Sequence, residues 1–65
     1  MQISVNGKTC SMDKVLTIQD LLDKLHLTGR LAVEVNQEII PRSLFSTRKL
    51  HAGDAIEIVH AIGGG

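Results

Sequence analysis

The sequence is nearly devoid of aromatic residues, with one Phe and no Trp or Tyr. Because hydrophobic residues still make up 43% of the chain, we expect a small aliphatic core. A single Phe cannot form the aromatic platform on which single-stranded nucleic acids stack. Charge of one sign is also lacking, since seven basic residues balance seven acidic ones. We therefore expect no nucleic acid among the partners.

Cysteine and long apolar runs are scarce too. The only cysteine is Cys10, so no internal disulfide can form, which favours a reducing compartment. No stretch approaches the ~20 apolar residues of a membrane span, and the start "MQISVNGKTC" lacks a basic segment followed by a long apolar run. These absences predict a cytoplasmic protein without a membrane partner.

The first half of the chain predicts a hairpin followed by a helix. Residues 1–6 alternate between apolar and polar side chains, Asn6-Gly7 is a strong signal for a tight turn, and residues 8–12 continue as a second strand. Thr17 is a good N-cap, with Asp20 as the partner in a capping box, and Gly29 is an expected end signal. The apolar stripe of this helix has helical spacing and consists of Ile18, Leu21, Leu22 and Leu25.

The second half predicts further strands. Alternation returns over residues 31–36, and a turn at residues 36–38 leads to a short strand that ends before Pro41 and should lie at an edge. Another turn at residues 51–54 precedes the longest β-like run, residues 55–62.

This order of elements predicts an α+β fold. A mixed sheet of four or five strands, covered on one face by the single helix, buries the helix stripe and one face of each strand. A right-handed crossover through the helix helps to place the first and last strands side by side in parallel. This is the β-grasp, or ubiquitin-like, arrangement. We expect residues 1–62 to form the domain and residues 63–65 to form a flexible glycine tail.

The three final glycines bury nothing and cost backbone entropy, so stability does not explain them. One interpretation is a frayed end without a function. The other is a narrow terminal segment, residues 63–65, called the glycine lead below. It would thread a channel in a partner and place a terminal carboxylate against a reactive phosphate. The residues alone leave both open.

The segments "MQISVNGK", "TIQDLLDKL" and "VEVNQEIIPRSLFSTRKLHAGDAIEIVHAIGGG" together resemble the ThiS family of sulfur carriers of thiamine biosynthesis over essentially the whole chain. An extra glycine, Gly63, before the terminal pair is the one departure from the family pattern. The resemblance implies that an ATP-using activating enzyme adenylates the carboxylate of Gly65, while Gly64 and Gly63 give access. It also implies that a sulfur donor protein converts this group to a thiocarboxylate, which supplies sulfur to thiazole synthase.

The resemblance thus implies a protein cosubstrate rather than an enzyme, with no cofactor of its own. A catalytic site is also not indicated by the residues, since no set of nucleophile, base and orienting group is apparent. The alternatives are a sulfur carrier of molybdopterin synthesis and a ubiquitin-like modifier, which would form isopeptide bonds to lysines. The short length and the "NQEIIPR" segment favour the thiamine branch.

Two further groups of residues are candidates for a function. Cys10 has no adjacent base, so we interpret it as a small hydrophobic residue rather than a catalytic one, and the spacing of the three histidines predicts no metal site. Phe45, Arg42 and Ile62 are candidates for docking a partner. For Phe45 and its apolar neighbours, closing the core is the simpler interpretation.

Overall fold

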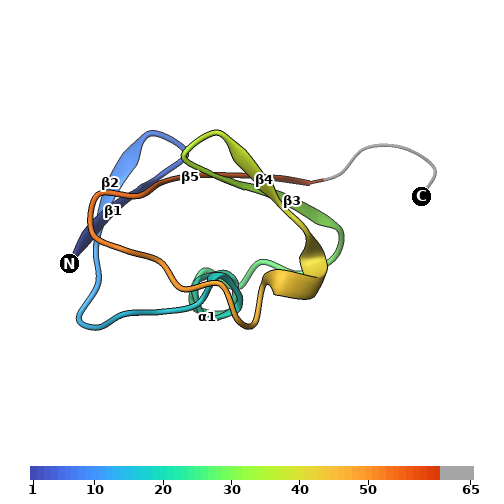
Figure 1. Ribbon diagram of the computed structural model, residues 1–65, viewed down its shortest axis with the longest axis horizontal. Helices are drawn as coiled ribbons and strands as arrows, with labels where there is room; N and C mark the ends of the chain where they lie inside the picture. Colours follow the sequence, from blue (N-terminus) through green and yellow to red (C-terminus); the bar gives the residue numbers. More distant parts are fainter. Residues whose placement is uncertain (61–65) are drawn as a thin grey trace.

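The computed structural model describes residues 1–60. Five strands, one α-helix and one 3-10 turn follow one another in the order shown in Figure 1. They are β1 (Gln2–Val5), β2 (Lys8–Ser11), α1 (Ile18–Lys24), β3 (Leu31–Val35), β4 (Glu38–Ile40), η1 (Arg42–Leu44) and β5 (Ala55–His60).

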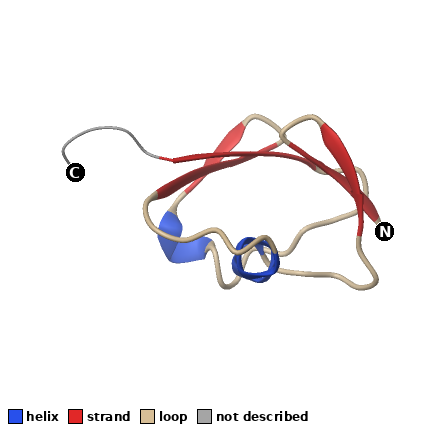
Figure 2. Ribbon diagram, turned by 180° about the vertical axis from the view of Figure 1, so that it is seen from behind, coloured by secondary structure: helices blue, strands red, loops and turns tan. Residues whose placement is uncertain are grey.

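The strands form one mixed five-stranded sheet in the order β2-β1-β5-β3-β4. β1 and β5 are parallel, and the other neighbours are antiparallel. Figures 1 and 2 show the sheet arching over α1, with η1 and the connecting segments on the same side. The predicted β-grasp arrangement is therefore confirmed, with five strands. β4 lies at an edge, as Pro41 predicted, because proline cannot donate to a strand ladder.

Two tight turns, which point in opposite directions along β5, have positive φ at both central positions. Asn6 and Gly7 have φ of 51° and 84°, which confirms the turn predicted from "NG". Asn36 and Gln37 have φ of 52° and 70°, so the β3–β4 turn is of the same kind although its second residue is not glycine. Both turns follow a strand that neighbours β5.

The start of α1 is as predicted. The backbone N–H of Asp20 donates to the Thr17 side chain at 3.1 Å, and the Thr17 N–H donates to the Asp20 carboxylate at 3.1 Å. This reciprocal pair is a capping box, which satisfies two backbone donors that the first turn would otherwise leave without a partner.

The end of α1 differs from the prediction. The helix stops at Lys24, well before Gly29, and His26 is the residue that takes the left-handed conformation, with φ of 58°. The N–H of Leu27 donates to the Leu22 carbonyl at 2.9 Å, and the N–H of His26 donates to Asp23 at 3.1 Å. This pair of bonds is a Schellman motif, in which glycine is the usual residue at the position of His26.

The core lies between the sheet and α1 and is almost entirely aliphatic, as the composition predicts. Phe45 is its one aromatic member and is only 4% exposed. No helix within residues 1–60 is long and apolar enough to span a membrane. The buried hydrophobic residues are Ile3, Val5, Met12, Ile18, Leu21, Leu22, Val33, Val35, Ile40, Phe45, Leu50, Ile56 and Ile58.

Candidate functional site

The predicted carrier site, Gly65 with Gly64 and Gly63, lies outside the described residues, and so does Ile62. What the structure describes is the strand that leads into this segment. β5 is the central strand of the sheet, with β1 on one side and β3 on the other. Its inward side chains Ile56 and Ile58 are 1% and 5% exposed, so burial anchors the strand from one face.

The pairing of β5 with β1 is short in the backbone and is extended by a side chain. The backbone register joins Ser4 to Ala55 and Val5 to Ile56. Beyond it, the Asn6 Nδ2 donates to the Ile58 carbonyl at 3.1 Å, and the Ile58 N–H donates to the Asn6 Oδ1 at 2.8 Å. The amide of Asn6 thereby takes the place of a further backbone unit beside β5.

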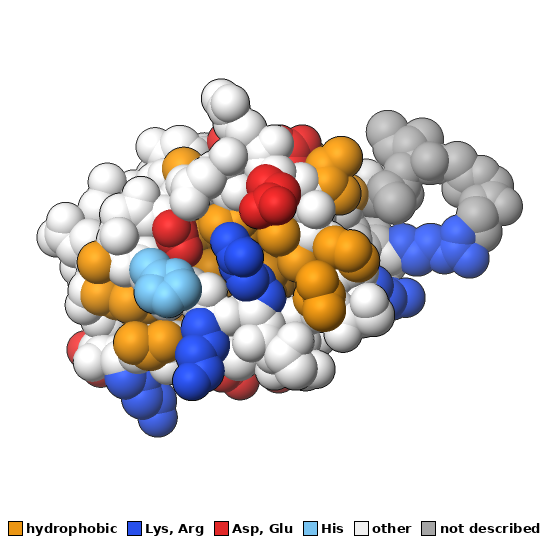
Figure 3. Space-filling view, viewed as in Figure 1, with side chains coloured by type: hydrophobic (Ala, Val, Ile, Leu, Met, Phe, Trp, Pro, Cys, Tyr) orange, Lys and Arg blue, Asp and Glu red, His pale blue; other side chains and the backbone are white. Residues whose placement is uncertain are grey.

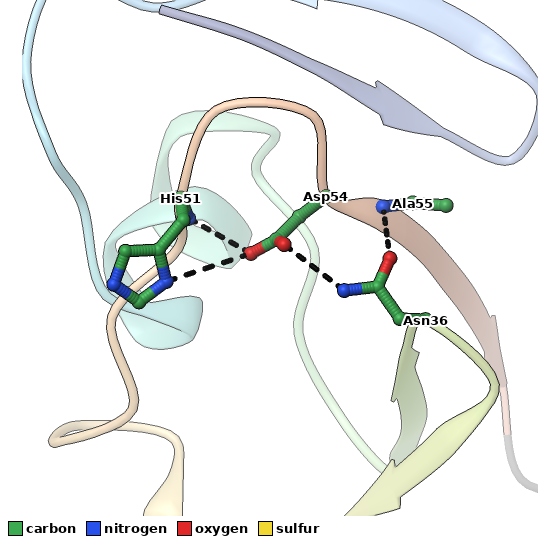
Figure 4. Close-up of polar contacts among 4 residues, drawn as sticks. All are labelled: Asn36, His51, Asp54 and Ala55. Atoms are coloured by element: carbon green, nitrogen blue, oxygen red, sulfur yellow. Dashed lines mark hydrogen bonds and ion pairs between the residues drawn. The ribbon is translucent and has the colours of Figure 1, made fainter.

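A second asparagine holds the start of β5 from the other side. The Ala55 N–H donates to the Asn36 Oδ1 at 2.9 Å, and the Asn36 Nδ2 donates to the Asp54 Oδ1 at 3.0 Å (Figure 4). The other Asp54 carboxylate oxygen accepts from the His51 backbone N–H at 2.8 Å. Asp54 is the one buried charged residue among those described, and these bonds compensate for its loss of water.

The outer face of the sheet carries an apolar strip near the end of β5. Val59 is 58% exposed and lies opposite Ala32 of β3. Ile39 of β4 is 74% exposed and lies opposite Glu34, which in turn is the register partner of Glu57. The strip is thus flanked by two carboxylate-bearing residues. Strand alternation in the sequence already places these side chains opposite the core.

The docking candidates occupy different environments. Phe45 belongs to the core, as the alternative interpretation expects, and its burial does not suit an exposed anchor. Arg42 is exposed at the start of η1, and its Nη2 donates to the Gly29 carbonyl at 3.0 Å.

Cys10 is partly buried against the core, which agrees with its interpretation as a small hydrophobic residue. Its Sγ lies 3.8 Å from the Lys8 carbonyl, and no other polar contact of this thiol is found among residues 1–60. Within the same range, no three or more His, Cys, Asp or Glu side chains gather where they could hold a metal ion.

A five-stranded mixed sheet with one covering helix, whose central strand is followed in the sequence by three glycines at positions 63–65, defines a small ubiquitin-like β-grasp protein. The sequence matches the model of the ThiS family over residues 3–65, and the chain belongs to this family.

Three relatives illustrate the family match. The chain is 42% identical over 65 residues to the sulfur carrier protein ThiS of Bacillus subtilis, with 97% of this chain and 98% of that protein covered. It is similar to the crystal structure of a thiamine biosynthesis protein (ThiS) from Geobacter metallireducens, with a TM-score of 0.88, 33% identity and 100% of both chains covered. It is also 38% identical over 66 residues to a thiazole synthase of Paramagnetospirillum magneticum, with 100% of this chain but only 20% of that protein covered.

Proposed function

We propose that this protein is a sulfur carrier of thiamine biosynthesis and that the carboxylate of Gly65 carries the sulfur. The observation that supports this proposal most is the match of residues 3–65 to the ThiS family, which includes the three glycines that the fold does not explain. The closely similar protein of Bacillus subtilis is itself named a sulfur carrier protein.

In the first proposed step, an oxygen of the Gly65 carboxylate attacks the α-phosphorus of ATP on an activating enzyme. Pyrophosphate leaves, and the product is an acyl adenylate. The terminal sulfur of a persulfide on a sulfur donor protein then attacks the acyl carbon, AMP leaves, and an acyl disulfide joins the two proteins. A thiol then attacks the donor's sulfur in this disulfide, so that the S–S bond breaks, the thiocarboxylate leaves, and the donor's sulfur and the thiol remain as a disulfide. The released product of these steps is a thiocarboxylate at Gly65, which donates its sulfur for the thiazole ring of thiamine. The protein is consumed and regenerated as a cosubstrate, and ATP is used by its partner.

Thiazole synthase is the proposed acceptor of the sulfur. The relative from Paramagnetospirillum magneticum that bears this name contains a region similar to this entire chain within a polypeptide about five times as long. A carrier-like region and a thiazole synthase thus share one chain in that organism, which is consistent with a direct transfer between two such proteins.

The fold contributes a rigid base for a narrow lead. β5 is held by neighbouring strands on both sides, by the amides of Asn6 and Asn36, and by the burial of Ile56 and Ile58. A fixed last strand limits the conformations that a partner must select before the carboxylate reaches ATP. Gly64 and Gly63 have no side chains, so a channel that receives them can be narrow.

The test is intact-mass spectrometry of the protein expressed with its native partners. We expect a population that is heavier by one exchange of oxygen for sulfur, with the change located at Gly65 by fragmentation. The Cys10→Ala variant is the control, because a persulfide on Cys10 would add a whole sulfur atom and would disappear in that variant. Conjugates through lysine would instead indicate a ubiquitin-like modifier, and an unmodified Gly65 under these conditions would contradict the proposal.

A further inference from the structure

Two exposed arginines lie near the end of the sheet at which the central strand, β5, ends. Arg30 directly precedes Leu31, and the register partner of Leu31 is His60, the last residue of β5. The Arg42 Nη2 donates at 3.0 Å to the Gly29 carbonyl, which belongs to the peptide bond that joins Gly29 to Arg30. The two residues, called the arginine pair below, are therefore neighbours although β3 and β4 separate them in the sequence.

The charge of the arginine pair is not balanced by an ion pair within residues 1–60. No Asp or Glu side chain of residues 1–60 lies within salt-bridge distance of either arginine. Along the sheet, Glu34 and Glu57 are three register positions from Leu31 and His60, which is about 10 Å at ~3.3 Å per residue. The backbone positions of these carboxylate-bearing residues are thus well apart from the arginine pair, and neither forms a salt bridge with it. Figure 3 shows Lys or Arg side chains at this end of the molecule.

Within residues 1–60, most N–H donors of the two arginines have no partner. A guanidinium has five N–H donors, and a single bond to the Gly29 carbonyl leaves most of those of Arg42 available. Arg30 makes no side-chain hydrogen bond within the described part of the chain. Planar guanidinium groups bind carboxylates and phosphates in a bidentate manner, so the ligand of the arginine pair is an anion of one of these two kinds.

The length of the segment after His60 decides whether the anion is a carboxylate or a phosphate. Gly65 is five positions after His60, and five extended residues span about 17 Å. If the Gly65 carboxylate is presented at the end of an extended lead, the reacting phosphates of ATP are too far from His60 for an arginine side chain at that level. The surface that meets the arginine pair is then the rim of the activating enzyme, where the lead enters.

We propose that the arginine pair binds carboxylate side chains of the activating enzyme at the entrance to the channel that receives the glycine lead. This inference rests on the proposed function and assigns its first recognition step to named residues. The attraction guides the end of β5 to the channel and sets the direction of entry. The arginine pair contributes to encounter and binding, since charges at the rim of an interface change mainly the association rate and its dependence on salt.

The experiment measures ATP–pyrophosphate exchange by the activating enzyme with the full-length carrier. Arg30→Glu is the main variant, because the Arg30 side chain makes no hydrogen bond to residues 1–60 whose loss could disturb the fold. Lys8→Glu is the matched control, since it makes the same charge change at an exposed residue of β2, the opposite edge strand. Carrier and ATP concentrations are varied separately, at about 0.01 M and about 1 M ionic strength, where the Debye length is about 30 Å and about 3 Å.

At low ionic strength we expect Arg30→Glu to raise the KM for the carrier about fivefold, and the double variant Arg30→Glu/Arg42→Glu to raise it further. The KM for ATP and kcat should stay unchanged, the effect should nearly vanish at high ionic strength, and Lys8→Glu should resemble the wild type. Equal effects of Arg30→Glu and Lys8→Glu would overturn the proposal. A raised KM for ATP instead would assign the arginines to phosphate, and a wild-type protein that supports no exchange would refute the proposed function itself.

Discussion

The side-chain amide of Asn6 exchanges two hydrogen bonds with the backbone of Ile58, at 2.8 and 3.1 Å, although the two residues are 52 positions apart. This contact joins the first hairpin to the last strand beyond the point at which their backbone pairing ends. β5, the strand that precedes the predicted glycine tail, is therefore held by a residue of the first turn. The contribution of this contact to stability can be tested by mutation.

Replacing Asn6 by Ala should destabilise the protein by about 2–3 kcal/mol. The change leaves the N–H and C=O of Ile58 without these partners, and it puts an L-residue that lacks a polar side chain at φ of 51°. Thermal unfolding measures the effect, which should be a fall in Tm of roughly 10 °C or more. Asn6→Gly is the control, since it relieves the backbone and removes only the amide. If Asn6→Gly is more stable than the wild type, the amide contact contributes less than the relief of the backbone, and the role assigned to it is contradicted.

Replacing His26 by Gly should stabilise the protein by about 0.5–1 kcal/mol. His26 has φ of 58° in the Schellman motif, a conformation that glycine adopts without the steric cost of a Cβ. His26→Ala keeps the Cβ and should give no such gain, which separates the backbone effect from the loss of the imidazole. Chemical denaturation of the three proteins gives the comparison, and a less stable glycine variant would contradict the assignment.

Replacing Gly64 by Val should leave the fold intact and abolish adenylation. Gly64 follows the last strand and is expected to lie outside the core, where substitutions usually change stability by no more than about 0.5 kcal/mol. A β-branched side chain would block a channel built for a glycine lead. Pyrophosphate release measures the activation, with Gly64→Ala as an intermediate in size. Equal release by the wild type and Gly64→Val would show that no narrow channel is involved.

Adding one alanine after Gly65 should uncouple binding from chemistry. The addition keeps the described fold, the glycines and a terminal carboxylate, but it moves that carboxylate about 3.5 Å along the lead. Because a displacement of ~1 Å can already cost about a hundredfold in a positioned reaction, adenylation should fall severely. Binding to the activating enzyme, measured by calorimetry, should largely persist. Thiocarboxylate formation at the natural rate would contradict the role proposed for Gly65.

Replacing Cys10 by Ala should lower stability modestly, by about 1 kcal/mol, since the partly buried thiol packs against the core. Thiocarboxylate formation should continue, because the proposed sulfur chemistry takes place at Gly65. Mass spectrometry of the folded variant after incubation with the partners provides the readout. A folded Cys10→Ala protein that no longer acquires sulfur would assign this thiol a part in the transfer.

Local sequence patterns determined most of the elements of this fold. The "NG" turn, the capping box of Thr17 and Asp20, and the alternation of the strands each depend on residues within a few positions of one another, and the structure contains all of them. The helix end was predicted wrongly because Gly29 is the usual kind of stop signal. The Schellman bonds at His26 formed earlier in the chain, at a residue type that rarely takes this conformation.

Only the tertiary structure decided which distant residues meet. That Asn6 and Asn36 both hold β5, and that Arg42 reaches the peptide before Arg30, depends on the order of strands in the sheet. Hydrophobic periodicity specifies which side of a strand is buried, but side-chain hydrogen bonds across the chain require the neighbours to be in place first. The sequence by itself therefore determined a β-grasp protein with a glycine end, whereas folding determined how β5, the strand that precedes that end, is held and which charged side chains lie near its last residue.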